Sequence, residues 1–83
     1  MRQCYLCGSV RNIEQHHLLT GYARSRADKY GLVVDLCHDC HSEVHDRNHD
    51  LLMALKQEGQ RRFEAQGHSR HEFMMEFGRN YLD

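Results

Sequence analysis

Two short segments near the N-terminus carry the apolar and β-branched residues typical of strands. They are RNIEQHHLL, residues 11–19, and GLVVDLC, residues 31–37. The polar stretch TGYARSRADKY separates them and is expected to form a loop. From Cys40 onward the spacing of apolar residues becomes helical.

The second half of the chain has the apolar spacing of two helices. One face of the first helix would carry Leu51, Leu52, Leu55, Gly59 and Phe63. Gly67 stands where a helix terminator is expected. Ser69 and Glu72 then have the spacing of a capping box, which predicts the start of a last helix. The apolar positions of that helix are Phe73, Met74, Phe77 and Tyr81. We expect these apolar residues in a core or an interface.

The order of predicted elements is knuckle, strand, loop, strand and three helices, which indicates a small α+β domain. The chain has 83 residues and no proline, and it shows no linker or repeat. It is therefore interpreted as one domain, residues 1–83, with a metal-rich part, residues 1–49, and a helical C-terminal extension, residues 50–83. A core of this size gives marginal stability, so a covalent or metal staple is expected.

Four cysteines form two C-x2-C pairs, Cys4 with Cys7 and Cys37 with Cys40. A tetrahedral zinc site needs two such chelating arms, and Gly8 would help the first arm to turn tightly. A redox dithiol is the alternative, but a second matched pair would be superfluous for it. Buried free thiols are a further alternative. Because four thiolates leave no open coordination position, the sequence predicts a structural zinc ion.

Histidines form a second cluster of candidate ligands. His41 and His45 are spaced i, i+4, so on a helix that starts near Cys40 both imidazoles can chelate one ion. His16 and His17 are adjacent on the first predicted strand, where neighbouring side chains diverge, so one can be a ligand and the other a general base. Solvated strand residues are the alternative for this pair. Solvated or capping roles are expected for His38, His49, His68 and His71, with His38 pointing away from the His41 face.

The order C-x2-C, HH, LC-x2-CH and x3-H resembles the HNH nucleases of the His-Me finger (ββα-metal) superfamily, particularly the small phage-type members with a Cys4 zinc site. The resemblance covers roughly residues 4–49. It implies a β-hairpin packed on a helix, with one catalytic divalent ion in the cleft. Carried over by position, His16 resembles the first metal ligand, His17 the general base, and His41 and His45 the two helix ligands.

One position departs from the pattern of this family. The family often has an asparagine a few residues before the LC, where it orders the hairpin loop. Tyr30, Gly31 and Leu32 occupy that neighbourhood here, and Asp35 is the nearest acidic side chain. The sequence therefore does not predict what holds His17 in place.

The resemblance implies hydrolysis of DNA phosphodiester bonds, with 5′-phosphate and 3′-hydroxyl ends and little sequence specificity. The formal net charge of −1 does not by itself indicate a nucleic-acid binder. Basic side chains near the predicted loop could still contact phosphates, and they are Arg11, Arg24, Arg26 and Lys29. A solvated loop is the alternative for this group.

Three neutral imidazoles favour zinc, nickel, cobalt or manganese over magnesium, which prefers oxygen ligands, and the identity of the catalytic ion stays open among these. No signal peptide and no apolar run near the roughly 18 residues of a membrane span is found. We therefore expect a cytoplasmic protein of a bacterium or a phage-infected host cell, as a monomer or a homodimer. The rival hypothesis is a noncatalytic zinc-binding adaptor for nucleic acid or protein.

Overall fold

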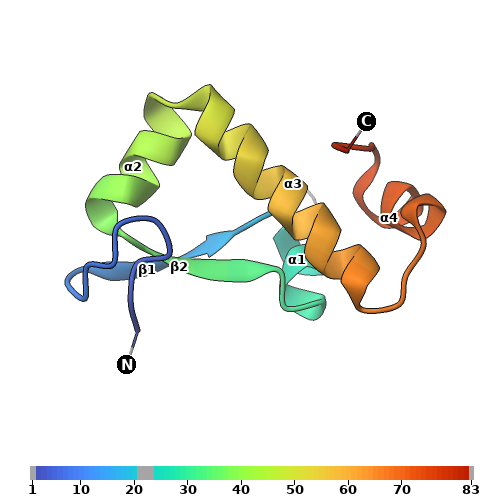
Figure 1. Ribbon diagram of the computed structural model, residues 1–83, viewed down its shortest axis with the longest axis horizontal. Helices are drawn as coiled ribbons and strands as arrows, with labels where there is room; N and C mark the ends of the chain where they lie inside the picture. The colour runs from blue at the N-terminus through green and yellow to red at the C-terminus, as the bar shows by residue number, and fades with distance from the viewer. Residues whose placement is uncertain (1, 21–23, 83) are drawn as a thin grey trace.

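The computed structural model describes residues 2–20 and 24–82. A two-stranded antiparallel sheet is formed by β1 (Ile13–His17) and β2 (Val33–Cys37). The helices of the described residues are α1 (Arg24–Lys29), α2 (His38–Asp46), α3 (His49–Ala65) and α4 (Arg70–Phe77). Figure 1 shows α2 and α3 meeting at an angle above the sheet, with α1 beside the end of the strands and α4 beyond the end of α3. The predicted small α+β architecture is confirmed at this level.

The register of the sheet decides which way each β1 side chain points. His16 lies opposite Val34 and His17 lies opposite Val33. Because successive strand side chains point to opposite faces, Glu14 and His16 share the face that meets α2, while the His17 side chain leaves the strand in another direction, toward α1. His16 is 1% exposed, whereas Gln15 beside it is exposed. The strand therefore sends the two adjacent histidines into different surroundings.

The segment between the strands contains the helix α1, where the sequence analysis expected a loop. This helix has six residues, and Ala27 is its buried residue. One buried apolar residue in six gives no helical periodicity, which is why the pattern did not predict the helix. Leu32 N–H donates to the carbonyl of Ala27 at 2.8 Å and so joins the helix to the start of β2. Residues 21–23 of the expected loop lie outside the described residues.

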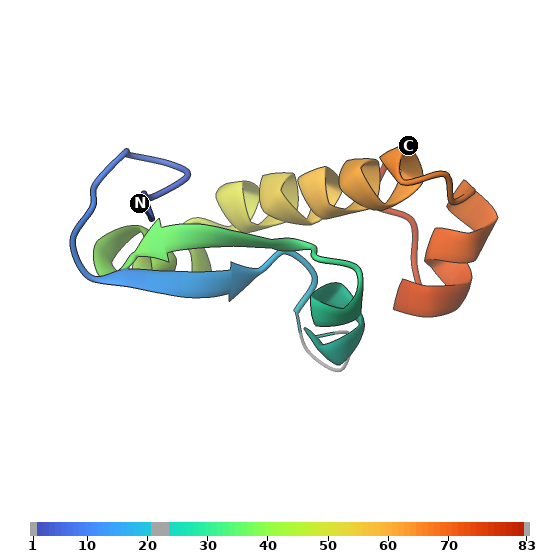
Figure 2. The same cartoon turned by 90° about the horizontal axis from the view of Figure 1, so that it is seen from below.

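Tyr30 connects this segment to the helical half of the chain. Its ring contacts the ring of Phe63 on α3 edge to face, with centroids 4.9 Å apart, and it also lies against Phe77 of α4. Gln66 donates to the Tyr30 carbonyl at 2.9 Å. Figure 2 shows α1 and α4 both below the level of α3 in that view, with α4 beyond the end of α3. The helices after residue 49 therefore help to place α1.

Helix α3 packs very closely over the chain that follows β1. Leu18 and Leu19 are almost fully buried, and Gly59 of α3 faces them. A Cβ atom added at Gly59 would lie 2.5 Å from Leu19 Cδ2 and 2.9 Å from Leu18 Cβ. Glycine is therefore needed here because α3 lies so close to Leu18 and Leu19. The backbone conformation of the helix at this position would itself accept other residues.

Gly59→Ala should lower the free energy of unfolding, by about 1–3 kcal/mol as is typical of overpacking. The sign is diagnostic, because alanine at an open helix position stabilises by roughly 0.8–1 kcal/mol relative to glycine. Urea unfolding followed by circular dichroism would measure the difference. A variant more stable than the parent would show that α3 does not approach Leu18 and Leu19 this closely.

The predicted capping box of the last helix is confirmed. The Ser69 hydroxyl accepts a hydrogen bond from Glu72 N–H at 3.0 Å, and Ser69 N–H donates to the Glu72 carboxylate at 2.8 Å. Gly67 has φ of +99° just after α3 and its cap, as expected for a terminator. Met74 is 46% exposed, so it is not a core residue, and of the two places we expected for it only an interface remains a prediction. Tyr81 lies beyond α4 and packs against the core.

A buried polar network that the sequence analysis missed attaches the C-terminal segment to α3. The Gln60 side chain is completely buried. Its amide nitrogen donates to the side-chain oxygens of Glu64 at 2.8 Å and Asn80 at 2.7 Å, and its oxygen accepts from Tyr81 N–H at 2.7 Å. The amide nitrogen and the amide oxygen of Gln60 thus both have partners inside the protein. These hydrogen bonds fix residues 80–82 against α3.

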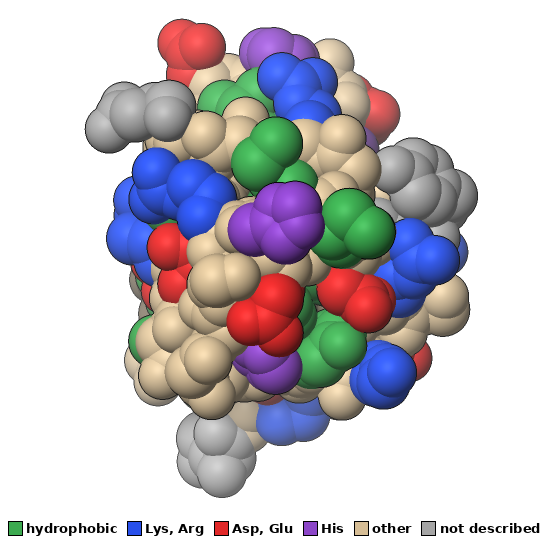
Figure 3. Space-filling view, turned by 90° about the vertical axis from the view of Figure 1, so that its right-hand side faces the viewer, with side chains coloured by type: hydrophobic (Ala, Val, Ile, Leu, Met, Phe, Trp, Pro, Cys, Tyr) green, Lys and Arg blue, Asp and Glu red, His purple; other side chains and the backbone are tan. Residues whose placement is uncertain are grey.

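Charge is mixed on the surface at the α4 end. Figure 3 shows basic side chains toward the edges of this face, with acidic, apolar and histidine side chains between them. Positive charge on this face is therefore broken up by other groups. Within the part of the chain that the structure describes, no helix has the length and apolar character needed to cross a membrane.

Candidate metal centres

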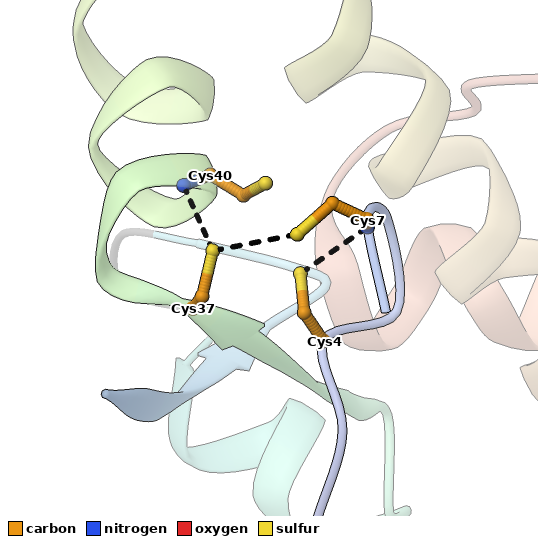
Figure 4. Close-up of side chains that lie close together, drawn as sticks. All are labelled: Cys4, Cys7, Cys37 and Cys40. Atoms are coloured by element: carbon orange, nitrogen blue, oxygen red, sulfur yellow. Dashed lines mark hydrogen bonds between the residues drawn. The ribbon is translucent and has the colours of Figure 1, made fainter. Parts of the chain in front are cut away.

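The four cysteines meet where the N-terminal segment lies against the junction of β2 and α2 (Figure 4). Their sulfur atoms all lie within 4.8 Å of one another. Cys4 N–H donates to the carbonyl of Ser9 at 2.8 Å, and Gly8 N–H donates back to the carbonyl of Cys4 at 3.0 Å, which closes the first arm into a tight turn. Gly8 has φ of +81°, a conformation that favours glycine. Tyr5 N–H then donates to the Asp35 carbonyl of β2 at 2.7 Å and so attaches the turn to the sheet.

The two C-x2-C arms have the same local geometry. Cys7 N–H lies 3.5 Å from Cys4 Sγ, and Cys40 N–H lies 3.5 Å from Cys37 Sγ. In the second arm Cys37 is also the N-cap of α2, so the sulfur receives a hydrogen bond from the first turn of the helix. Backbone N–H groups that point at sulfur stabilise the thiolate over the thiol. Both arms therefore direct a backbone N–H group at the sulfur of their first cysteine.

The ionisation of the thiols shows why this cluster suits a cation. Burial raises the pKa of Cys4, but backbone N–H groups from both arms lower it more, to about 6. Burial also raises the pKa of the Cys40 thiol, and its contacts with the other three thiols raise it further. One thiolate therefore makes the next one harder to form unless positive charge is supplied. A divalent ion supplies that charge, so the donor set fits a metal such as zinc.

A second cluster consists of one histidine from β1 and two from α2. The ring centroid of His16 lies 5.3 Å from that of His41 and 5.2 Å from that of His45. His41 and His45 are one helical turn apart, with centroids separated by 4.9 Å. One nitrogen from each of the three rings lies within 4.8 Å of the others. The structure thus brings together the three histidines predicted as ligands of the second ion.

His16 has the properties of a ligand rather than of an ordinary core histidine. Both of its ring nitrogens are buried, and neither has a hydrogen-bond partner. Leaving buried polar atoms unpaired costs about 1–3 kcal/mol in proteins, so such atoms normally have a partner. Burial, together with the charges of His41 and His45, lowers the pKa of His16 to about 4. A neutral imidazole with a free lone pair beside two other imidazoles fits a bound divalent ion.

Glu14 is a site residue that the sequence analysis missed. Its carboxylate accepts a hydrogen bond from His41 Nδ1 at 2.8 Å and from His38 Nδ1 at 3.0 Å. These hydrogen bonds lower the pKa of Glu14. With Nδ1 of His41 bound to the carboxylate, its Nε2 remains for an ion, the usual arrangement of a metal-ligating histidine. Contrary to expectation, His38 therefore meets the same carboxylate as His41.

His17 lines the same hollow as the three-histidine cluster but is not one of its converging ligands. The hollow has a volume of about 320 Å³ and is lined by Gln15, Thr20 and Arg24 together with His16, His17, His41 and His45. His17 Nε2 lies 3.3 Å from Asp28 Oδ1, and Arg24 Nε lies 3.4 Å from His17 Nδ1. Both partners belong to α1, so the helix absent from the sequence prediction supplies the surroundings of His17.

The four basic residues predicted to contact nucleic acid lie in different places. Arg24 lines the hollow beside His17. Arg26 instead joins α1 to α4, because it donates to the backbone carbonyl of Glu76 and pairs with its carboxylate at 3.8 Å. Lys29 lies over the ring of Tyr30, and Arg11 lines a separate hollow next to the start of α2. Contact with nucleic acid stays a prediction for all four residues. Of these, Arg24 contacts His17 and lines the same hollow as the three-histidine cluster.

A scan against protein-family models, a search of curated proteins and a search of solved structures found no match to the chain.

Proposed function

We propose that the chain is a metal-dependent endonuclease of the HNH type, with a His-Me finger core made of β1, β2 and α2, that hydrolyses DNA to 5′-phosphate and 3′-hydroxyl ends. One observation carries the proposal. The buried, unpaired nitrogens of His16 converge with His41 and His45 in an open hollow that also holds His17. A set of three protein ligands with room beside it is the catalytic kind of metal site, whereas four cysteines make the structural kind.

The residues of the hollow divide the chemistry among them. His16, His41 and His45 would hold the divalent ion, and Glu14 would orient His41. Such an ion, when bound, supplies charge stabilisation for the phosphate and for the leaving 3′ oxygen. His17 lies outside the ligand group and would accept the proton of the attacking water as general base. Arg24 lines the same hollow and would supply a fixed positive charge for a phosphate.

The order of elements also supports the proposal. The resemblance implies a hairpin followed at once by a helix that carries two ligands. Here the antiparallel pair β1 and β2 is followed directly by α2, and the last residue of β2 is the N-cap of that helix. His16 faces α2 from the strand next to β2, which is the relation that a strand ligand needs with two helix ligands.

Cleavage of supercoiled plasmid DNA by the purified chain tests the function. Reactions should contain manganese, cobalt, nickel, zinc or magnesium, and the ends should be analysed for 5′-phosphate. Elemental analysis after mild chelation should find one tightly held zinc and one exchangeable ion. A single ion, or two equally inert ions, together with intact DNA in every metal, would reject the nuclease in favour of the noncatalytic adaptor.

His45→Ala should weaken binding of the exchangeable ion by at least about 100-fold, because loss of an outer-shell partner alone typically costs 10- to 100-fold. The zinc of the four cysteines should remain, because His45 lies on the side of α2 that faces His16. Isothermal titration and elemental analysis would measure both ions. His71→Ala is the matched control, since His71 is exposed on α4. Equal loss of both ions from the His45 variant would mean that the ligands are partitioned wrongly.

A further inference from the structure

Helix α1 places two side chains of opposite charge on the two nitrogens of His17. Arg24 and Asp28 are one helical turn apart, so both side chains lie on one face of the helix. Arg24 Nε is 3.4 Å from His17 Nδ1, and Asp28 Oδ1 is 3.3 Å from His17 Nε2. The His17 side chain is only 11% exposed, whereas that of Asp28 is 63% exposed. The imidazole is thus enclosed by the protein while its carboxylate partner still reaches the solvent.

The two contacts select one form of the ring. A guanidinium has only N–H groups to donate, and an ionised carboxylate can only accept. Because Arg24 Nε donates to Nδ1, Nδ1 must present its lone pair, and the proton of the neutral ring is then on Nε2, which faces the Asp28 carboxylate at 3.3 Å. The charged imidazolium would set its Nδ1 N–H group against the N–H groups of the Arg24 guanidinium, and the other neutral form would do the same while turning a lone pair of Nε2 toward the Asp28 carboxylate. The neutral ring with the proton on Nε2 satisfies both partners.

We propose that Asp28 is the positioning residue of His17, and that Arg24 covers the proton-accepting Nδ1 until a phosphate group draws the guanidinium away. This inference rests on the proposed function. It adds that Nδ1 is the proton-accepting atom of His17, that Asp28 orients the ring, and that Arg24 binds the phosphate. A phosphate oxygen is the stronger partner for Arg24, because a charged acceptor binds a guanidinium more tightly than a neutral imidazole nitrogen does. Binding of the substrate thus uncovers the base in the same step that fixes the phosphate beside it.

The proton and the bonds can be followed through the reaction. As the water oxygen bonds to phosphorus, the bond from phosphorus to the 3′ oxygen breaks and one water proton moves to His17 Nδ1. The imidazolium that forms carries N–H groups on both nitrogens, and the Asp28 carboxylate faces the one on Nε2 at 3.3 Å. The 3′ oxygen takes a proton from solvent, and His17 later returns its proton to solvent.

Asp28 is largely exposed, so its contact with His17 should contribute little to stability, and its effect should be seen in rate rather than in folding. Asp28→Ala should lower kcat by about 10- to 100-fold, which is part of the 10²- to 10⁴-fold typical of a general base, at unchanged KM, metal content and melting temperature. Asp28→Asn keeps an oxygen acceptor and should recover part of the loss. In the His17→Ala background, Asp28→Ala should have no further effect. Asp50→Ala, at an exposed acid of α3, is the matched control.

Arg24 is tested separately by its effect on substrate binding. Arg24→Ala should raise KM for DNA by about tenfold, the loss expected when one charge-assisted contact is removed, with a smaller change in kcat. A drop in kcat alone would overturn the role given to Arg24. Equal losses from Asp28→Ala in the parent and in the His17→Ala background, or a loss that follows a lowered melting temperature, would overturn the role given to Asp28.

A readout independent of cleavage separates this inference from the proposed function. Long-range proton–nitrogen NMR of the zinc-loaded protein should show the His17 proton on Nε2 in the parent, and a mixture of the two neutral forms in Asp28→Ala. A proton on Nδ1 in the parent would overturn the assignment. If the NMR result is the expected one and no metal supports cleavage, the orientation of His17 stands and the nuclease function fails.

Discussion

Cys37→Ser should unfold much of the N-terminal half of the chain. Cys37 is buried, belongs to the cysteine cluster, and is the N-cap of α2, so its replacement affects the metal and the helix start together. Structural zinc contributes on the order of 10 kcal/mol to the folding of small zinc domains. The whole stability of a domain is about 5–15 kcal/mol, so this loss is comparable to all of it.

Circular dichroism melting and zinc content would measure the effect of Cys37→Ser. Treatment of the parent with a strong chelator should reproduce it, and the variant itself should respond little to the chelator. Ser42→Ala, on the same helix and outside both clusters, is the control and should melt like the parent. Unchanged melting and metal content in the cysteine variant would refute the four-cysteine site.

His17→Ala should keep the fold, both ions and DNA binding, yet cleave roughly 10²- to 10⁴-fold more slowly, the range typical of a missing general base. His16→Ala should behave differently, because its ring nitrogens point into the converging ligand set. It should bind the exchangeable ion more weakly, and added metal should restore part of its activity. Single-turnover cleavage at several metal concentrations distinguishes the two variants, with His71→Ala as control.

Two results would contradict these roles. His17→Ala could cleave as fast as the parent, in which case the base lies elsewhere. Added metal could rescue His17→Ala and fail to rescue His16→Ala, in which case the two adjacent histidines must exchange roles. The geometry argues against the exchange, because His16 is within reach of both helix histidines while the side-chain partners of His17, Arg24 and Asp28, are on α1.

The features that could be predicted from the sequence are those carried by local spacing. The C-x2-C arms, the i, i+4 histidines and the Ser69 capping box each depend on residues a few positions apart, and the structure brings each set together. The antiparallel pairing of β1 and β2 likewise joins two segments that had the right composition. Spacing and composition within short segments were therefore enough to predict these features.

The missed features depend on contacts between distant segments. Helix α1 is held against α3 and α4 by the contacts of Tyr30. Its own six residues include one buried apolar residue, Ala27, and therefore show no helical periodicity. Because α1 was not predicted, neither was the pairing of Arg24 and Asp28 around His17. Glu14 could have been found, since it precedes His16 by two residues and a strand sends such pairs to the same face. The role of Arg26 could not, because charge alone does not tell which neighbour it meets.

Helix α2 carries residues of both candidate metal centres, so the two proposed ions should bind in a fixed order. Its first turn carries Cys40 and is capped by Cys37, while His41 and His45 lie along its next turns. The histidines can converge only once this helix is formed and fixed against β1, and its start is fixed by the cysteine cluster. We therefore expect the second ion to bind late in assembly, after zinc capture. If the proposed function holds, a newly made chain should not cleave DNA until the first metal is in place, whatever other ions surround it.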